Sequence, residues 1–231
     1  MGGFCGVISS GDCVSDLFFG TDYHSHLGTH RGGLCVLGEK GFQRSIHNIQ
    51  NAPFRSKFER DVSNLVGSVG LGVISDTDPQ PLVMRCAHGT FALVTVGLIT
   101  NIEALMQEMF EKNHLQLQYS TTSGMVGPTE VVSAILASAP TLEEGVKLVQ
   151  QKVEGSCSFM IVTETGRFLA VRAAINNKTY SEVKNIFEED PELAERLYNV
   201  VLEFNRPTLG RQKAGPSRPR PPAKKQPEEA K

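Results

Sequence analysis

The sequence predicts an α+β domain, in which antiparallel strands are covered by helices. Two observations carry this prediction. Apolar residues along 4–172 change between alternating and helical spacing, in the order strand, helix, strands, helices, strands. The final two strands are separated only by Glu164-Thr165-Gly166, which has the length and composition of a hairpin turn. The 40% hydrophobic content of the 231-residue chain is sufficient for a core.

The first half of the domain is predicted to contain four strands and one helix. The helix is expected at 12–26, because Asp12 is a suitable N-cap and apolar residues then recur on one face. Gly32-Gly33 is expected to turn the chain into the second strand. The strands are expected at 4–9, 34–38, 65–75 and 89–99.

Three helices and a hairpin are predicted in the second half. Asn101 is a candidate N-cap for the first helix, and Pro128 suits the first turn of the second. Thr141 and Glu144 have the spacing of a capping box at the start of the third. The helices are expected at 101–113, 128–138 and 141–153, and the hairpin strands at 156–163 and 167–172.

The composition changes after residue 172, which divides the chain into three predicted parts. Residues 1–172 are expected to form the domain, and residues 173–204 a helical extension with apolar residues at helical spacing. Residues 205–231 carry eight Lys or Arg and two Glu, a charge of +6, with several prolines and no apolar face. This last part is expected to be a disordered basic tail.

Composition excludes several classes of function. The formal net charge of −2 predicts no general attraction to nucleic acid or to an anionic membrane, so neither is an expected partner. There is no secretory signal and no apolar run of the roughly 20 residues that a membrane span requires. The cysteines are far apart and include no CxxC pair, which argues against a disulfide framework or a metal site. We therefore expect a cytoplasmic protein with reduced thiols, no metal and no cofactor.

Seven short motifs occur in an order and spacing that are more specific together than any is alone. They are Cys5-Gly6-Val7-Ile8, His30-Arg31-Gly32, Pro79-Gln80-Pro81, Gly89-Thr90-Phe91-Ala92-Leu93-Val94, Gly97, Thr100-Asn101 and Thr129-Glu130-Val131. Over about residues 4–172 the chain resembles the class II glutamine amidotransferases, most closely the N-terminal half of amidophosphoribosyltransferase. The resemblance implies a four-layer αββα N-terminal-nucleophile sandwich.

The resemblance also implies a reaction, the hydrolysis of glutamine to supply ammonia for purine synthesis. In that family an N-terminal cysteine, activated by its own α-amino group, attacks the glutamine amide and forms a thioester. Cys5 matches this nucleophile, but removal of Met1 alone would expose Gly2 and leave Cys5 without its base. The alternative interpretation is that Cys5 is a small buried residue of the first strand.

Two further residues are assigned by the resemblance. Arg31 corresponds to an arginine near the family's active site and is a candidate for substrate binding; the alternative is an arginine that anchors a turn. Gly97 corresponds to the glycine whose backbone N–H stabilises the oxyanion, and it is a candidate catalytic residue.

The chain departs from the family where polar ligands are expected. The tract Gly70-Leu71-Gly72-Val73-Ile74-Ser75 lacks the arginine that binds the glutamine carboxylate. Val96 stands in place of the asparagine that donates to the oxyanion, and Pro128 in place of the aspartate that binds the α-amine. Because each polar ligand has become apolar or rigid, the sequence predicts a degenerate glutaminase.

Three functions follow as hypotheses. The first is an active or weakly active amidotransferase module that binds glutamine, and the second is a non-catalytic interaction or regulatory domain on the same fold. A nucleic-acid binder driven by residues 205–231 is the third and the least favoured. Residues 173–231 contain no phosphoribosyl-pyrophosphate motif, so a phosphoribosyltransferase would have to be a partner chain. The oligomeric state, including a homo-oligomer, stays open.

Overall fold

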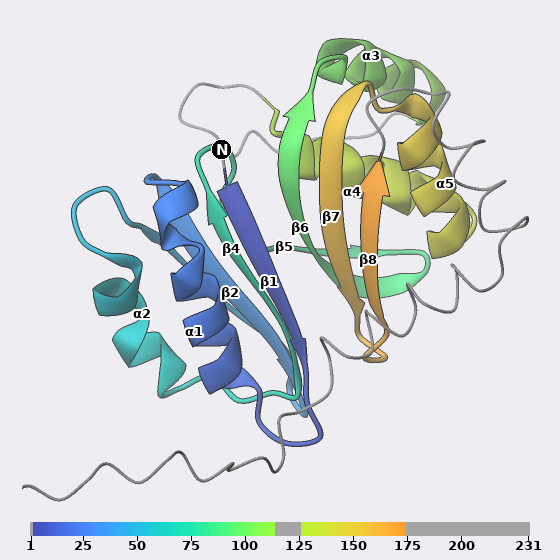
Figure 1. Ribbon diagram of the computed structural model, residues 1–231. Helices are drawn as coiled ribbons and strands as arrows, with labels where there is room; N and C mark the ends of the chain where they lie inside the picture. Colours follow the sequence, from blue (N-terminus) through green and yellow to red (C-terminus); the bar gives the residue numbers. More distant parts are fainter. Residues whose placement is uncertain (1, 114–125, 174–231) are drawn as a thin grey trace, which may run out of the picture.

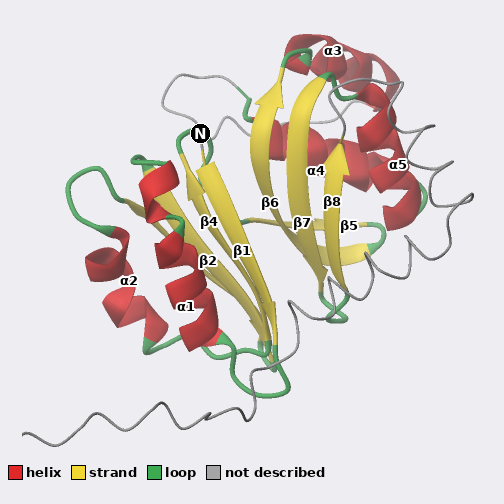
Figure 2. Ribbon diagram, viewed as in Figure 1, coloured by secondary structure: helices red, strands yellow, loops and turns green. Residues whose placement is uncertain are grey.

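The computed structural model describes residues 2–113 and 126–173 (Figure 1). Within these ranges the chain forms two antiparallel four-stranded sheets and five α-helices, which confirms the prediction of antiparallel strands combined with helices (Figure 2). The predicted helical extension lies outside the described residues apart from Ala173, and the predicted basic tail lies outside them completely. No helix in the described ranges has the length and apolar character needed to cross a bilayer.

Sheet A has the strand order β1-β4-β2-β3. Its strands are β1 (Gly2–Ile8), β2 (Arg31–Gly38), β3 (Gly41–Asn48) and β4 (Val69–Ser75). Cys5 is paired with Gly72 in the middle of the β1–β4 ladder, and Arg31 at the start of β2 is level with Ser75 at the end of β4. The first residues of β1 and β2 therefore lie at the same end of the sheet as the last residue of β4.

Sheet B has the order β5-β6-β7-β8. Its strands are β5 (Leu82–Cys86), β6 (Gly89–Ile99), β7 (Gly155–Thr163) and β8 (Phe168–Ala173). β7 accompanies β6 from Phe91 to Ile99, whereas β5 pairs only with Gly89–Leu93. The C-terminal half of β6 therefore has, among the described residues, a strand on one side only.

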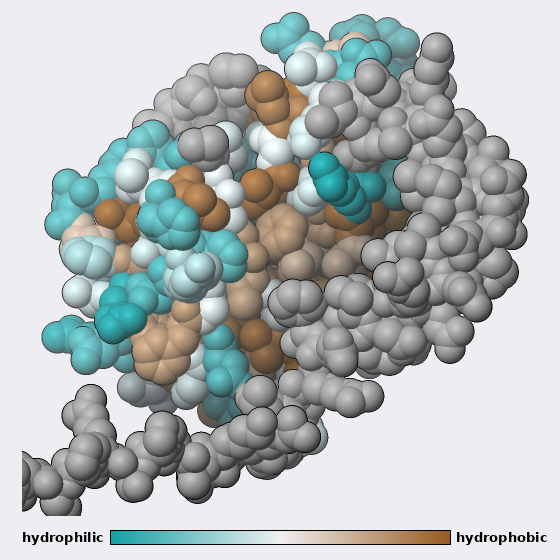
Figure 3. Space-filling model, viewed as in Figure 1, coloured by the Kyte–Doolittle hydropathy of each residue, from teal (hydrophilic) through white to brown (hydrophobic). Residues whose placement is uncertain are grey.

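Helices cover the outer face of each sheet (Figure 1). α1 (Val14–Tyr23) and α2 (Phe54–Val62) pack on sheet A, with the 3-10 turn Ser25–Leu27 after α1. α3 (Ile102–Asn113), α4 (Pro128–Ser138) and α5 (Leu142–Lys152) pack on sheet B. The inner faces meet through a third apolar cluster that includes Leu71, Val73 and Val94, and Figure 3 shows hydrophobic residues along the middle of the face where the sheets meet.

Several predicted boundaries are confirmed. β6 and α4 have the predicted limits, and the hairpin turns at Gly166 with a φ of +80°, a conformation that favours glycine. α5 begins after Thr141, whose hydroxyl accepts the backbone N–H of Glu144 at 3.2 Å, as the capping-box pattern predicted.

One predicted cap is wrong, and a second is confirmed in position only: Asn101 directly precedes α3 and its C=O accepts the Leu105 N–H at 3.0 Å, but its side chain does not cap the helix. Cys13 occupies the N-cap position of α1, and the Asp12 carboxylate instead accepts the backbone N–H of Gly67 at 3.0 Å. The Asn101 side chain bonds across to the end of α5, donating to Lys152 O at 2.8 Å and accepting from the Glu154 N–H at 3.0 Å. In both cases a partner distant in sequence competes successfully for a side chain that could have capped its own helix.

The predicted Gly32-Gly33 turn is also wrong, since both glycines lie inside β2. They are required by packing: a Cβ on Gly32 would lie 2.6 Å from the Phe54 ring, and a Cβ on Gly33 would overlap the carbonyl oxygen of Gln80. β3, α2 and β5 were not predicted at all, and the predicted strand 65–75 begins only at Val69.

Candidate functional site

A cavity of about 490 Å³ opens where the N-terminal end of β1 meets the C-terminal end of β4. The end of β6 and the first turn of α4 complete its wall. The lining residues are Gly2, Ile74, Ser75, Thr77, Thr95, Val96, Gly97, Leu98 and Pro128. We call this cavity the neutral pocket, because none of the lining residues that the structure describes has a charged side chain.

The neutral pocket brings together the substituted positions identified in the sequence. Ile74 comes from the tract that lacks the carboxylate-binding arginine, Val96 and Gly97 from the altered oxyanion motif, and Pro128 from the tract that lacks the aspartate. These tracts belong to three different elements, yet they border one cavity. Sequence motifs alone could not show this convergence, because the elements meet only in the folded chain.

A buried glutamine organises one wall of the neutral pocket. Gln80 is 2% exposed, and its carboxamide pairs with the backbone of Thr95 in both directions. Gln80 Oε1 accepts the Thr95 N–H at 2.7 Å, and Gln80 Nε2 donates to Thr95 O at 3.1 Å. Nε2 also donates to Ser75 Oγ at 3.3 Å. Gln80 precedes Leu82, the first residue of β5, and its side chain extends the β5–β6 ladder by one position. It also links β4 to β6.

A buried aspartate fixes α4 beside this wall. Asp78 is 1% exposed, and its Oδ2 accepts the backbone N–H of Thr129 at 2.9 Å in the first turn of α4. The Thr129 hydroxyl lies 2.5 Å from that of Thr95. Asp78 Oδ1 has no hydrogen-bond partner among the described residues, and a Cβ on Gly127 would overlap it. Burial raises the pKa of Asp78, although the bonds to Thr129 and the charge of Arg31 oppose this.

Asp78→Asn is expected to raise the free energy of unfolding near pH 7. Because the folded-state pKa of Asp78 lies above its unfolded value, ionisation costs stability as the pH rises through that window. Below about pH 4, where Asp78 is protonated in both states, the variant and the parent should converge. Urea unfolding of both proteins between acid and neutral pH measures this difference. A difference that grows on acidification would contradict the assignment.

The structure places Cys5 outside the neutral pocket. Its thiol packs against α1, where a Cβ on Gly20 would lie 2.5 Å from Cys5 Sγ. Neighbouring residues of a strand point to opposite faces, so Phe4 points toward sheet B and Cys5 toward the helices. Burial, and then the charge of Asp16, raises the pKa of the Cys5 thiol, which is the opposite of what a reactive thiolate requires.

Of the other two predicted site residues, one borders the pocket and one lies beside it. Gly97 is in the wall formed by β6. Arg31 is not a lining residue, but its strand position is level with Ser75, and its charge partly opposes the rise in the pKa of Asp78 that burial causes. The sequence motifs did not predict the polar wall formed by Ser75, Thr77, Gln80 and Thr95. Pro79-Gln80-Pro81 was its one available signal.

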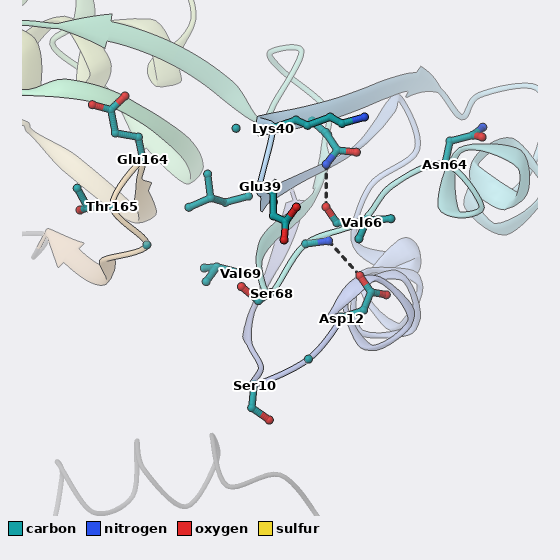
Figure 4. Close-up of a pocket in the computed structure, with 17 residues that line it drawn as sticks. Ser10, Asp12, Glu39, Lys40, Asn64, Val66, Ser68, Val69, Glu164 and Thr165 are labelled. Carbon is teal, nitrogen blue, oxygen red and sulfur yellow. Dashed lines mark hydrogen bonds between the residues drawn. The ribbon is translucent and has the colours of Figure 1, made fainter.

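A second hollow, of about 850 Å³, lies at the opposite end of the sheets (Figure 4). Figure 4 shows Glu164 on the β7–β8 turn at one side and Asn64 at the other, with the Lys40 ammonium directed away from Glu164. Its charged side chains Asp12, Glu39, Lys40 and Glu164 are exposed to solvent. The neutral pocket has the more enclosed polar groups and is the better candidate for a functional site.

Comparison with known proteins supports the fold and gives no close relative. No protein-family model matches the sequence, and no curated protein matches it. Among solved structures, the chain is similar to the glutamine phosphoribosylpyrophosphate (PRPP) amidotransferase from B. subtilis complexed with ADP and GMP. The identity is 19% and the TM-score 0.61, over 74% of this chain and 37% of that chain.

A second similar structure is described as the allosteric regulatory enzyme of purine biosynthesis. Its identity is 19% and its TM-score 0.60, over 71% of this chain and 36% of that chain. The chain therefore has an amidotransferase-like fold and spans little more than a third of the length of these two proteins. That extent is consistent with the N-terminal glutamine amidotransferase half of PRPP amidotransferase, the part that the sequence motifs resemble.

Proposed function

We propose that the chain is a glutamine amidotransferase-like domain that binds a small molecule without hydrolysing glutamine. The observation that carries the proposal is the neutral pocket. The substituted positions Ile74, Val96 and Pro128 border this cavity, and none of the described residues that line it has a charged side chain. This is the degenerate glutaminase that the sequence predicted, acting as a binding or regulatory domain.

The chemistry of glutamine argues against it as the ligand. At neutral pH its α-carboxylate and α-amine are both charged, and each loses water on entering a pocket. Desolvating a charge is unfavourable unless an opposite charge or several strong hydrogen bonds replace the water. Ile74, Val96 and Pro128 offer neither. A domain with this pocket should therefore prefer uncharged molecules.

The position of Cys5 supports the same proposal. As an N-terminal nucleophile, Cys5 would need a free α-amino group, so the chain would have to begin at this residue. Gly2, Gly3 and Phe4 would then be lost, together with their pairing to Ile74 and its neighbours on β4 and the contact of Phe4 with sheet B. The exposed amine would lie in mid-strand, whereas the β1 residue that borders the pocket is Gly2.

The arrangement of the layers is part of the proposal. We infer that α1 and α2, the two facing sheets, and α3 to α5 constitute the four-layer αββα N-terminal-nucleophile sandwich. The contacts of α1 and α2 with sheet A and of the other helices with sheet B support this, as does the similarity to PRPP amidotransferase. A phosphoribosyltransferase partner chain, a homo-oligomer and a cytoplasmic location stay predictions from the sequence.

A glutaminase assay tests the proposal. The full chain, Cys5→Ala and Cys86→Ala are incubated with glutamine, and released glutamate is measured. Cys86 is a matched control because it is a half-buried thiol on β5 outside the pocket. We expect no release above the protein-free rate from any of the three. Release that is abolished by Cys5→Ala and retained by Cys86→Ala would overturn the proposal.

A further inference from the structure

Two large aromatic side chains stand on the outer surface of α1. Phe19 is 58% exposed, and Tyr23 is 76% exposed, the largest fraction among the large hydrophobic side chains of the described ranges. α1 packs on the face of sheet A that is turned away from sheet B (Figure 1). Single exposed apolar side chains are ordinary, but two neighbouring aromatics on one helix form a patch that a partner can bury.

The helical period makes these aromatics part of one stripe. The helix buries four side chains against sheet A, namely Val14, Leu17, Phe18 and Thr21. At 3.6 residues per turn, Asp16, Phe19 and Tyr23 lie on the opposite side as neighbours three and four residues apart. His26 is exposed in the 3-10 turn that follows, and its ring contacts that of Tyr23. We call Asp16, Phe19, Tyr23 and His26 the α1 stripe.

Both aromatic rings are held in place although they are exposed. The Arg55 guanidinium of α2 lies over the Phe19 ring, 5.7 Å from its centroid, and bonds to the Asp22 carboxylate at 2.5 Å. The Tyr23 ring lies edge-on to two histidine rings, with centroids 5.6 Å from that of His24 and 6.1 Å from that of His26. Rings that are already ordered lose less conformational entropy when a partner covers them.

A two-fold axis makes the α1 stripe complementary to itself. If Phe19 faces Tyr23 of the partner subunit in an antiparallel helix pair, the same register brings Asp16 opposite His26 of the partner subunit, because both pairs are centred on position 21. Each contact then occurs twice. If the two copies of Phe19 faced each other instead, Asp16 would approach Asp22 of the partner subunit, and like charges would oppose that register.

The two polar members of the stripe are available for this contact. Asp16 is exposed, and none of the ion pairs among the described residues involves it. His26 Nδ1 lies 2.8 Å from Tyr23 O, and since a carbonyl oxygen only accepts, Nδ1 donates and Nε2 is left for a partner. Nε2 can donate to a carboxylate only when the ring is charged. Within one copy, Tyr23 is the titratable side chain in contact with this ring, apart from any residue outside the described ranges.

We propose that two copies of this chain associate through the α1 stripe, with Phe19 of each copy against Tyr23 of the other and Asp16 against His26. Phenylalanine, tyrosine and a flanking arginine are residue types that contribute strongly to protein interfaces. The stripe is one helix wide and about 15 Å long, which is less than the roughly 800 Å² per partner that a stable interface buries. The dimer should therefore be weak, with a dissociation constant between about 0.1 and 1 mM.

Sedimentation equilibrium of the full chain at concentrations up to about 1 mM tests this inference. We expect a reversible monomer–dimer equilibrium, which Phe19→Ser should weaken at least about tenfold because both copies lose a ring from the contact. Phe110→Ser is the matched control, since Phe110 is a 40% exposed phenylalanine on α3, on the other sheet. It should leave the dissociation constant unchanged.

Charge variants at the ends of the stripe test the register. His26→Glu would face the carboxylate of Asp16 and should weaken the dimer, whereas His26→Lys places a permanent positive charge there and should strengthen it, each about fivefold at low salt. Both variants lose the bond to Tyr23 O, so their difference reports the charge. In a chain that also carries Asp16→Lys, the order of the two variants should reverse.

Three results would each overturn this inference. They are the absence of a dimer at about 1 mM, an equal effect of Phe19→Ser and Phe110→Ser, and an order of the two His26 variants that Asp16→Lys does not reverse. The inference is independent of the proposed function, because the α1 stripe shares no residue with the neutral pocket. Glutamate release in the glutaminase assay would leave it standing.

Discussion

Gly33→Ala is expected to destabilise the protein by about 3 kcal/mol, the upper range for forcing one methyl group into a packed interior. Gly33 is buried in β2 beneath the segment that carries Gln80. A Cβ there would overlap the Gln80 carbonyl oxygen and lie 2.7 Å from both Gln80 C and Pro81 Cδ. Two of these three atoms belong to the backbone and cannot rotate away, so the strand or the segment must move.

Urea unfolding measures this loss, with Gly11→Ala as the control. A Cβ on Gly11 would have no atom within 4 Å, so the control should stay within about 0.5 kcal/mol of the parent. If Gly33→Ala also stays within that range, then the contact between β2 and the Gln80 segment is not rigid. The polar wall of the neutral pocket would then lack the support described above.

Gln80→Leu is expected to cost about 4 kcal/mol. Leucine has a similar size but no polar group, so the N–H and C=O of Thr95 would be buried without partners, and each such group costs about 1–3 kcal/mol. Gln107→Leu is the control, because Gln107 is exposed on α3 and bonds only to Glu111, at 2.8 Å, among the described residues. Chemical unfolding should show a change below about 0.5 kcal/mol for the control.

Gln80→Glu adds a pH dependence that the leucine variant lacks. A carboxylate at this position would face the carbonyl oxygen of Thr95, whereas the protonated acid could still donate to it. The folded-state pKa of the new acid should therefore lie above its unfolded value, and stability should fall as the pH rises from about 4 toward neutrality. Equal stability at acid and neutral pH would show that the carboxamide is not the group that closes the β5–β6 ladder.

The sequence could predict elements whose pattern is strong and local. β6 is rich in Phe, Val, Leu and Ile and has turn residues before it, and α4 starts at a proline, so both were predicted at their observed limits. β3 and α2 carry weaker patterns. β3 is an edge strand of half-exposed residues, and α2 is a short helix whose buried contacts are mainly Phe54 and Phe58. β3 shows no clear alternation, and the apolar residues of α2, Phe54, Phe58 and Val62, recur at helical spacing over only nine residues.

The candidate site could be predicted only in part, for a physical reason. Motifs indicated that Gly97, Val96 and Pro128 belong to one site, and they do border one cavity. The face on which Cys5 lies depends on the parity of its position in β1, because a shift of one residue exchanges the two faces of a strand. The bonds of Gln80 to Thr95 join residues 15 positions apart, and no local pattern encodes them.

β5 begins only at Leu82, opposite Leu93, so it leaves the C-terminal half of β6 without a partner on that side among the described residues. This has a consequence for self-association. A long unpaired strand edge is a template on which a second chain can add a strand and begin aggregation. Here Gln80 covers the edge at Thr95, and Pro81 has no N–H to offer a neighbouring strand, so only a short part of the described edge is left uncovered. So short an edge cannot align another strand, and the gap in sheet B therefore offers little template for aggregation.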